Sequence, residues 1–65
     1  MSTQSDHAEL STLRSQLDDL TARVVNVSDR YRETPDSSIA ADLDAAERGL
    51  VAARRAVARA LVTLG

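Results

Sequence analysis

Apolar residues in the N-terminal half of the chain recur at alternating intervals of three and four positions. They run without a break from Leu10 to Tyr31, and most of the positions between them are polar. Such spacing is a heptad repeat, in which the first and fourth positions, a and d, are apolar. The a residues are Leu10, Leu17, Val24 and Tyr31, and the d residues are Leu13, Leu20 and Val27. The pattern predicts a helix with a coiled-coil seam along one side.

The C-terminal half repeats this pattern with smaller residues at d. The a residues are Leu43, Leu50, Val57 and Leu64, and the d residues are Ile39, Ala46, Ala53 and Ala60. Small side chains let two helix axes approach closely, so we expect a tight seam here. Gly49 stands beside this seam, and a mid-helix glycine costs about 1 kcal/mol relative to alanine. A close backbone approach would explain it, and simple tolerance is the alternative.

The capping and helix-breaking residues predict a disordered tail at residues 1–5, a helix at 6–33, a turn at 34–37 and a helix at 38–64. Asp6 with Glu9 three residues later forms a capping box at the start of the first helix. Pro35 disfavours a helical conformation for the residue before it, which ends that helix. Four residues remain open as the cap of the second helix: Thr34, Asp36, Ser37 and Ser38.

Two helices of similar length joined by a short turn fold back antiparallel. Folding about this turn pairs residues whose numbers sum to about 70, because both helices rise equally per residue. Leu20 then lies opposite Leu50, and Val24 opposite Ala46, so the two heptads agree in register. The predicted fold is an all-α antiparallel two-helix coiled-coil hairpin.

Apolar residues also occur outside the predicted seam, and they form a candidate partner face. This face comprises Val25, Val51, Ala58, Leu61 and Val62. A chain of 65 residues seldom buries enough surface to fold alone, and with no cysteine and one histidine it has neither disulfides nor a zinc site to help. We therefore expect the hairpin to dimerise into a four-helix bundle or to dock on a helix of a different protein. The orientation of the dimer stays open.

The charge pattern offers a second candidate site. All eight basic residues are arginines, and the second helix carries a candidate anion patch at Arg48, Arg54, Arg55 and Arg59. This patch would suit a small regulator that binds nucleic acid or an anionic membrane. A net charge of −2 and a single aromatic residue favour the alternative, a solvated helix face. The chain shows no cofactor motif, no basic leader and no membrane-spanning apolar run, so we expect a cytoplasmic protein.

Residues 10–33 raise the possibility of an enzyme. Leu13 and Arg14, followed by Asp18 and by Arg30 or Arg32, resemble the opening helix of the small all-helical chorismate mutases. The resemblance implies a mutase active site built on these residues. That family's site also uses a lysine and a third helix, whereas this chain has no lysine and its two predicted helices take up the remaining residues. From the residues themselves we expect a non-catalytic protein that acts through protein–protein association.

Overall fold

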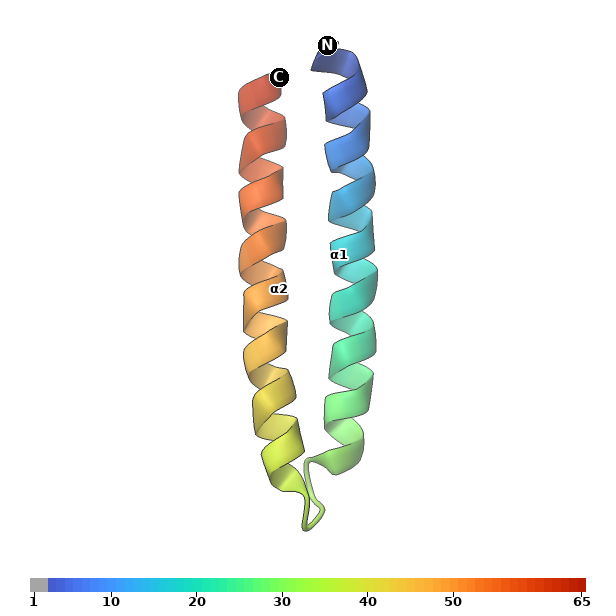
Figure 1. Cartoon of the computed structure of the whole chain (residues 1–65), viewed down its shortest axis with the longest axis vertical. Helices are drawn as coiled ribbons and strands as arrows, with labels where there is room; N and C mark the ends of the chain where they lie inside the picture. Colours follow the sequence, from blue (N-terminus) through green and yellow to red (C-terminus); the bar gives the residue numbers. More distant parts are fainter. Residues whose placement is uncertain (1–2) are drawn as a thin grey trace.

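The computed structural model describes residues 3–65, which form two helices joined by a short turn. Helix α1 spans Thr3–Tyr31 and helix α2 spans Ser37–Leu64. The helices run antiparallel, with the first turn of α1 beside the last turn of α2 (Figure 1). The predicted all-α hairpin is confirmed. Of the predicted disordered tail, residues 1 and 2 lie outside the described residues, and residues 3 to 5 belong to α1.

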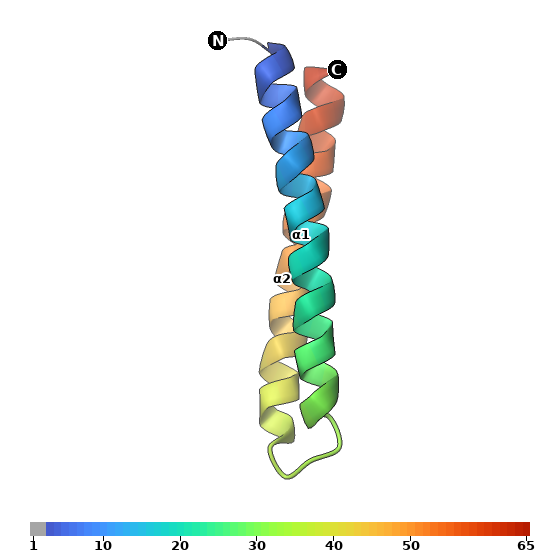
Figure 2. The same cartoon turned by 90° about the vertical axis from the view of Figure 1, so that its right-hand side faces the viewer.

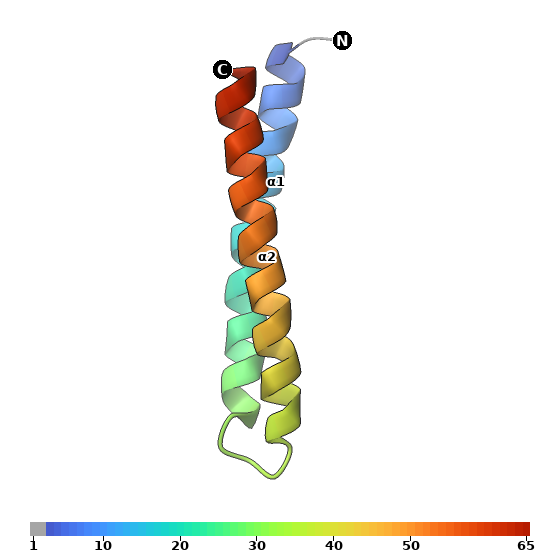
Figure 3. The ribbon, with the colours of Figure 1, turned by 90° about the vertical axis from the view of Figure 1, so that its left-hand side faces the viewer.

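The two helices stay side by side along their whole length. Views from two opposite sides show them crossing at a shallow angle, with the turn at one end (Figures 2 and 3). The molecule is a rod whose Cα atoms extend over 51 × 14 × 14 Å. Such a shape gives each helix only one neighbour, so most of its circumference faces outward.

Helix α1 starts and stops slightly earlier than predicted. It begins at Thr3, which places Asp6 inside the first turn, where the helix dipole favours a negative charge. It ends at Tyr31, because both the backbone N–H and the hydroxyl of Thr34 donate to the Tyr31 carbonyl, at 3.2 and 2.8 Å. These two bonds close the turn and leave Pro35 outside both helices.

Helix α2 is bounded by a cap residue at each end. Asp36, one of the four candidates, occupies the N-cap position and accepts a backbone bond from Ile39 at 2.9 Å. At the other end, Gly65 has a positive φ of 49° and donates its N–H to the Leu61 carbonyl at 3.0 Å. A glycine in this left-handed conformation ends a helix without steric cost.

Bonds between the helices agree with the predicted register. Ser28 bonds to Ala40 and to Asp44, and Asp18 forms an ion pair with Arg54. In each of these pairs the residue numbers sum to between 68 and 72. The helices are therefore aligned along their length as the matched heptads require.

The rotation of the helices about their axes differs from the predicted seam. The half-buried a residues still lie between the helices, but their companions are the fifth heptad residues, e, and not the d residues. All seven of these e residues are buried or half-buried: Arg14, Thr21, Ser28, Ala40, Glu47, Arg54 and Leu61. Because successive residues are about 100° apart around a helix, exchanging d for e turns each seam by roughly 50°.

The turned seam leaves five d residues exposed. Leu13, Leu20 and Ile39 keep 39%, 42% and 39% of their surface in solvent. Ala46 and Ala53 are exposed as well, while Val27 and Ala60 are half-buried. The expected tight contact at Gly49 is also absent inside the hairpin, since a Cβ added there would meet nothing within 4 Å.

A buried serine explains why the helices meet along e. Ser28 is only 1% exposed and faces Ala40, so two small residues allow close approach at this point. The Ser28 hydroxyl donates to the Ala40 carbonyl at 3.3 Å or to Asp44 Oδ1 at 2.9 Å. Arg32 covers the cluster with a two-pronged bond to the Asp44 carboxylate, at 3.0 and 3.1 Å. Paired geometry of this kind is both directional and strong.

The Asp44 cluster makes the stability of the hairpin depend on pH. Hydrogen bonds from Arg32 and then from Ser28 hold the pKa of Asp44 below the usual aspartate value of about 3.9. A carboxyl whose pKa is lowered by folding stabilises the fold above its unfolded pKa, and this contribution is lost as the pH falls through the folded pKa.

We therefore expect the melting temperature to fall with acidification below about pH 4, and to fall less steeply in the Asp44→Asn variant. Melting followed by circular dichroism between acidic and neutral pH measures both profiles. Glu33→Gln, at an exposed acid outside the cluster, is the matched control and should keep the wild-type profile. Equal pH profiles for wild type and Asp44→Asn would contradict the role given to the cluster.

Candidate functional site

The exposed d residues form one apolar surface along the rod. Together with the two half-buried d residues, Val27 and Ala60, we call this surface the open face. It comprises Leu13, Leu20, Val27, Ile39, Ala46, Ala53 and Ala60. A groove between the helices opens on part of this face and is lined by Leu20, Val24, Val27, Leu43 and Arg23. The groove shows that a and d residues of α1 lie on the same side of the hairpin as Leu43, an a residue of α2.

The two helices contribute side chains of different size to the open face. Helix α1 offers the large side chains Leu13, Leu20 and Val27. Ile39 of α2 is large as well, but between residues 46 and 60 helix α2 offers a stripe of small residues at the d positions and at the neighbouring g positions: Ala46, Gly49, Ala53, Ala56 and Ala60. The first four of these are exposed and the last is half-buried. The α1 edge of the open face is therefore a ridge of large side chains, and the α2 edge carries small ones from residue 46 to residue 60.

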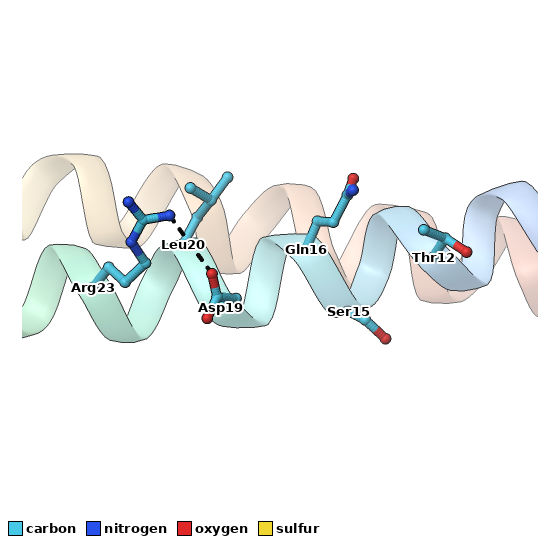
Figure 4. Close-up of a pocket in the computed structure, with 6 residues that line it drawn as sticks. All are labelled: Thr12, Ser15, Gln16, Asp19, Leu20 and Arg23. Atoms are coloured by element: carbon cyan, nitrogen blue, oxygen red, sulfur yellow. Dashed lines mark ion pairs between the residues drawn. The ribbon is translucent and has the colours of Figure 1, made fainter.

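Polar residues border the ridge. Figure 4 shows Leu20 with Gln16 and Arg23 projecting from the same side of α1, around a shallow hollow. Arg23 forms an ion pair with Asp19 at 3.7 Å, and both side chains are mostly exposed. A pair this long and exposed contributes little to stability, so it marks a solvated rim beside the apolar ridge.

The predicted partner face does not form one exposed surface. Leu61 is one of the two buried apolar residues among residues 3–65, and it lies at an e position of the seam. Val25, Val51 and Ala58 are half-buried at its border. Only Val62 points outward, with 81% of its surface exposed. Four of the five predicted residues are thus buried or half-buried, whereas most of the open face is exposed.

The predicted anion patch is divided by the fold. Arg54 lies at the seam, where it forms an ion pair with Asp18 of the other helix. Arg48, Arg55 and Arg59 are exposed. The hollow beside the first two of them is also lined by Asp44 and Glu47, so its charge is mixed. An anion would find no uniformly positive surface there.

The residues that resemble the chorismate mutase pattern are used elsewhere in the hairpin. Arg14 is half-buried at the seam, and Arg30 is exposed near the turn. Asp18 binds Arg54, and Arg32 binds Asp29 and Asp44. Asp18 and Arg32 are thus paired within the chain, although the resemblance would assign their charges to a substrate. The neighbouring acids Asp18 and Asp19 contact different arginines, Arg54 and Arg23.

The described part of the chain holds no group of three or more histidine and acidic side chains that could bind a metal ion. Within the same residues, neither helix is both long enough and apolar enough to cross a membrane. A comparison with protein-family models, with curated proteins and with solved structures found no match to this chain.

The adjacent residues Arg54 and Arg55 allow a test of the seam. Arg54→Ala removes the bond to Asp18 and the packing of a half-buried side chain, whereas Arg55→Ala changes an exposed one. We expect Arg54→Ala to destabilise the fold by up to about 1 kcal/mol and Arg55→Ala to have little effect. Urea denaturation of the two variants compares them directly. Equal effects would mean that Arg54 does not lie at the seam.

Proposed function

We propose that this chain is a non-catalytic association module, which acts by packing its open face against helices of another protein chain. The observation that carries the proposal is the exposure of Leu13, Leu20 and Ile39 on one face, while Ser28 and Ala40 are buried between the helices. A coiled-coil seam normally buries d residues in preference to e residues. Here the d residues are left for a second contact.

The shape of the hairpin supports the same conclusion. Its surface of 4733 Å² exceeds the roughly 4,000 Å² expected of a compact monomer with a mass of 7.0 kDa. Only two apolar residues among the described ones, Ala40 and Leu61, are buried. A two-helix unit with so small a core needs further helices to complete it. A four-helix bundle made from two hairpins would supply them.

The charged clusters serve the hairpin itself in this account. The two interhelix clusters, around Asp44 near the turn and Asp18 in the middle, use Arg32 and Arg54 to join α1 to α2. The open face is apolar, so its binding partner is a protein surface of matching character. The chain would then function as an assembly or adaptor unit whose partner helices cover the groove.

The mass of the chain in solution tests this function. We expect light scattering after size exclusion to give twice the chain mass of 7.0 kDa at micromolar concentration. Leu13→Asp should abolish the dimer, because burying an unpaired carboxylate in an apolar contact is costly. Val62→Asp is the matched control on the outer surface and should leave the mass unchanged. A folded wild-type monomer, or a dimer lost only in Val62→Asp, would contradict the proposal.

A further inference from the structure

The open face lies where a second neighbour of each helix would be in a bundle. Positions e and d are about 100° apart around a helix, with a between them. In a four-helix bundle each helix has two neighbours at about 90° to one another and turns its remaining apolar residues to the centre. In this hairpin, e contacts the present neighbour, so d faces the direction of the missing one and a points to the centre.

The size of each side chain and its position along the helix axis indicate which residues can pack against each edge of the open face. Residues at equal height on the two helices have numbers that sum to about 70, as the Ser28 and Asp18 contacts show. Leu20 is therefore at the height of Gly49 and Ala53, and Leu13 is at the height of Ala56 and Ala60. Each of these two leucines on α1 has small residues at its own height on α2, whereas Val27 is at the height of Asp42 and Ala46.

We propose that the partner is a second copy of this chain, related by a twofold axis parallel to the helices, so that both turns lie at the same end of a four-helix bundle. The α1 ridge of each copy packs into the small-residue stripe on α2 of the other copy, with Leu20 against Gly49. This arrangement rests on the proposed function, and it specifies the partner and the contacts.

Gly49 is independent support for this packing. A glycine in mid-helix costs about 1 kcal/mol relative to alanine, yet within the hairpin a Cβ at Gly49 would meet nothing within 4 Å. No intramolecular contact of the described residues accounts for its lack of a side chain. In the proposed dimer the Leu20 side chain of the other copy occupies the space above the Gly49 backbone.

Charge and area agree with a second copy. Arg30 and Asp42 flank the open face at similar heights on α1 and α2, are both exposed, and take part in no ion pair within residues 3–65. In the proposed dimer, Arg30 of one copy faces Asp42 of the other. The 51 × 14 Å outline of the hairpin gives a face on the order of 700 Å², close to the roughly 800 Å² per partner of a standard interface.

The other twofold arrangement fits less well. An axis perpendicular to the helices places the turns at opposite ends and packs α1 against α1 and α2 against α2. Large residues then face large ones on one side, and small residues face small ones on the other. Because helix spacing depends on the side chains at the contact, the two sides would need different spacings.

An exchange of the large and small residues tests the Leu20 to Gly49 contact. Leu20→Ala and Gly49→Leu should each raise the dimer Kd by about tenfold or more, the first by leaving a void and the second by overpacking. The double variant restores one large and one small residue at each contact, and its Kd should return to within about fivefold of wild type. Ala41→Leu, on the exposed outer surface, is the control.

Sedimentation equilibrium measures these constants, and circular dichroism checks that each variant is helical. Recovery in the double variant excludes simple misfolding as the cause of the single effects. Additive losses in the double variant, with no recovery, would overturn the contact between Leu20 and Gly49.

Disulfide trapping tests the orientation, because the chain has no cysteine of its own. Gln16→Cys and Ala56→Cys, each in a separate preparation, place thiols at exposed positions of equal height on facing edges. Mixing and mild oxidation should link one variant to the other, and neither to itself. A dimeric mixture in which this link does not form would overturn the arrangement. So would a link from Gln16→Cys to itself, or to a third variant, Arg23→Cys, when the two are mixed. Each of these results would leave association itself intact. A folded monomer would overturn both proposals.

Discussion

The packing of Ser28 against Ala40 is the contact on which the rest of the hairpin depends. The Ser28 hydroxyl is buried between the helices. It can donate to the Ala40 carbonyl or to the Asp44 carboxylate, which Arg32 also binds. A buried hydroxyl must have partners, so this point fixes both the height and the rotation of α2 relative to α1. The a and e residues are thereby turned inward along the whole length, and the d residues are turned outward.

The heptads were sufficient to predict two helices, their turn and their alignment, because apolar spacing and Pro35 act locally. They were not sufficient to predict the rotation. A stripe made of a and d residues is wide enough to serve two contacts, and the polar e residues Arg14, Thr21 and Glu47 look like solvent positions. The available signal was the small pair Ser28 and Ala40 at equal height. For the same reason, Leu61 is buried in the seam and not exposed on a partner face.

Charged and small residues lie in different parts of the hairpin and make different contacts. Arg32 and Arg54 hold the two helices together, and the exposed arginines share their surroundings with Asp44 and Glu47. Ala46, Gly49, Ala53 and Ala56 do not tighten the hairpin, since they are exposed on its outside. In the proposed dimer they receive the large side chains of α1. A single hairpin carries both kinds of residue, which is the basis for proposing a copy of itself as the partner.

The central claim is that the fold is completed by a second chain, and the dependence of thermal stability on protein concentration tests it most directly. When folding is coupled to dimerisation, mass action raises the melting temperature as the chain concentration increases. Melting curves recorded by circular dichroism over about a hundredfold range of concentration should therefore shift steadily upward. A melting temperature that stays constant over that range, with full helical content at the lowest concentration, would contradict the account.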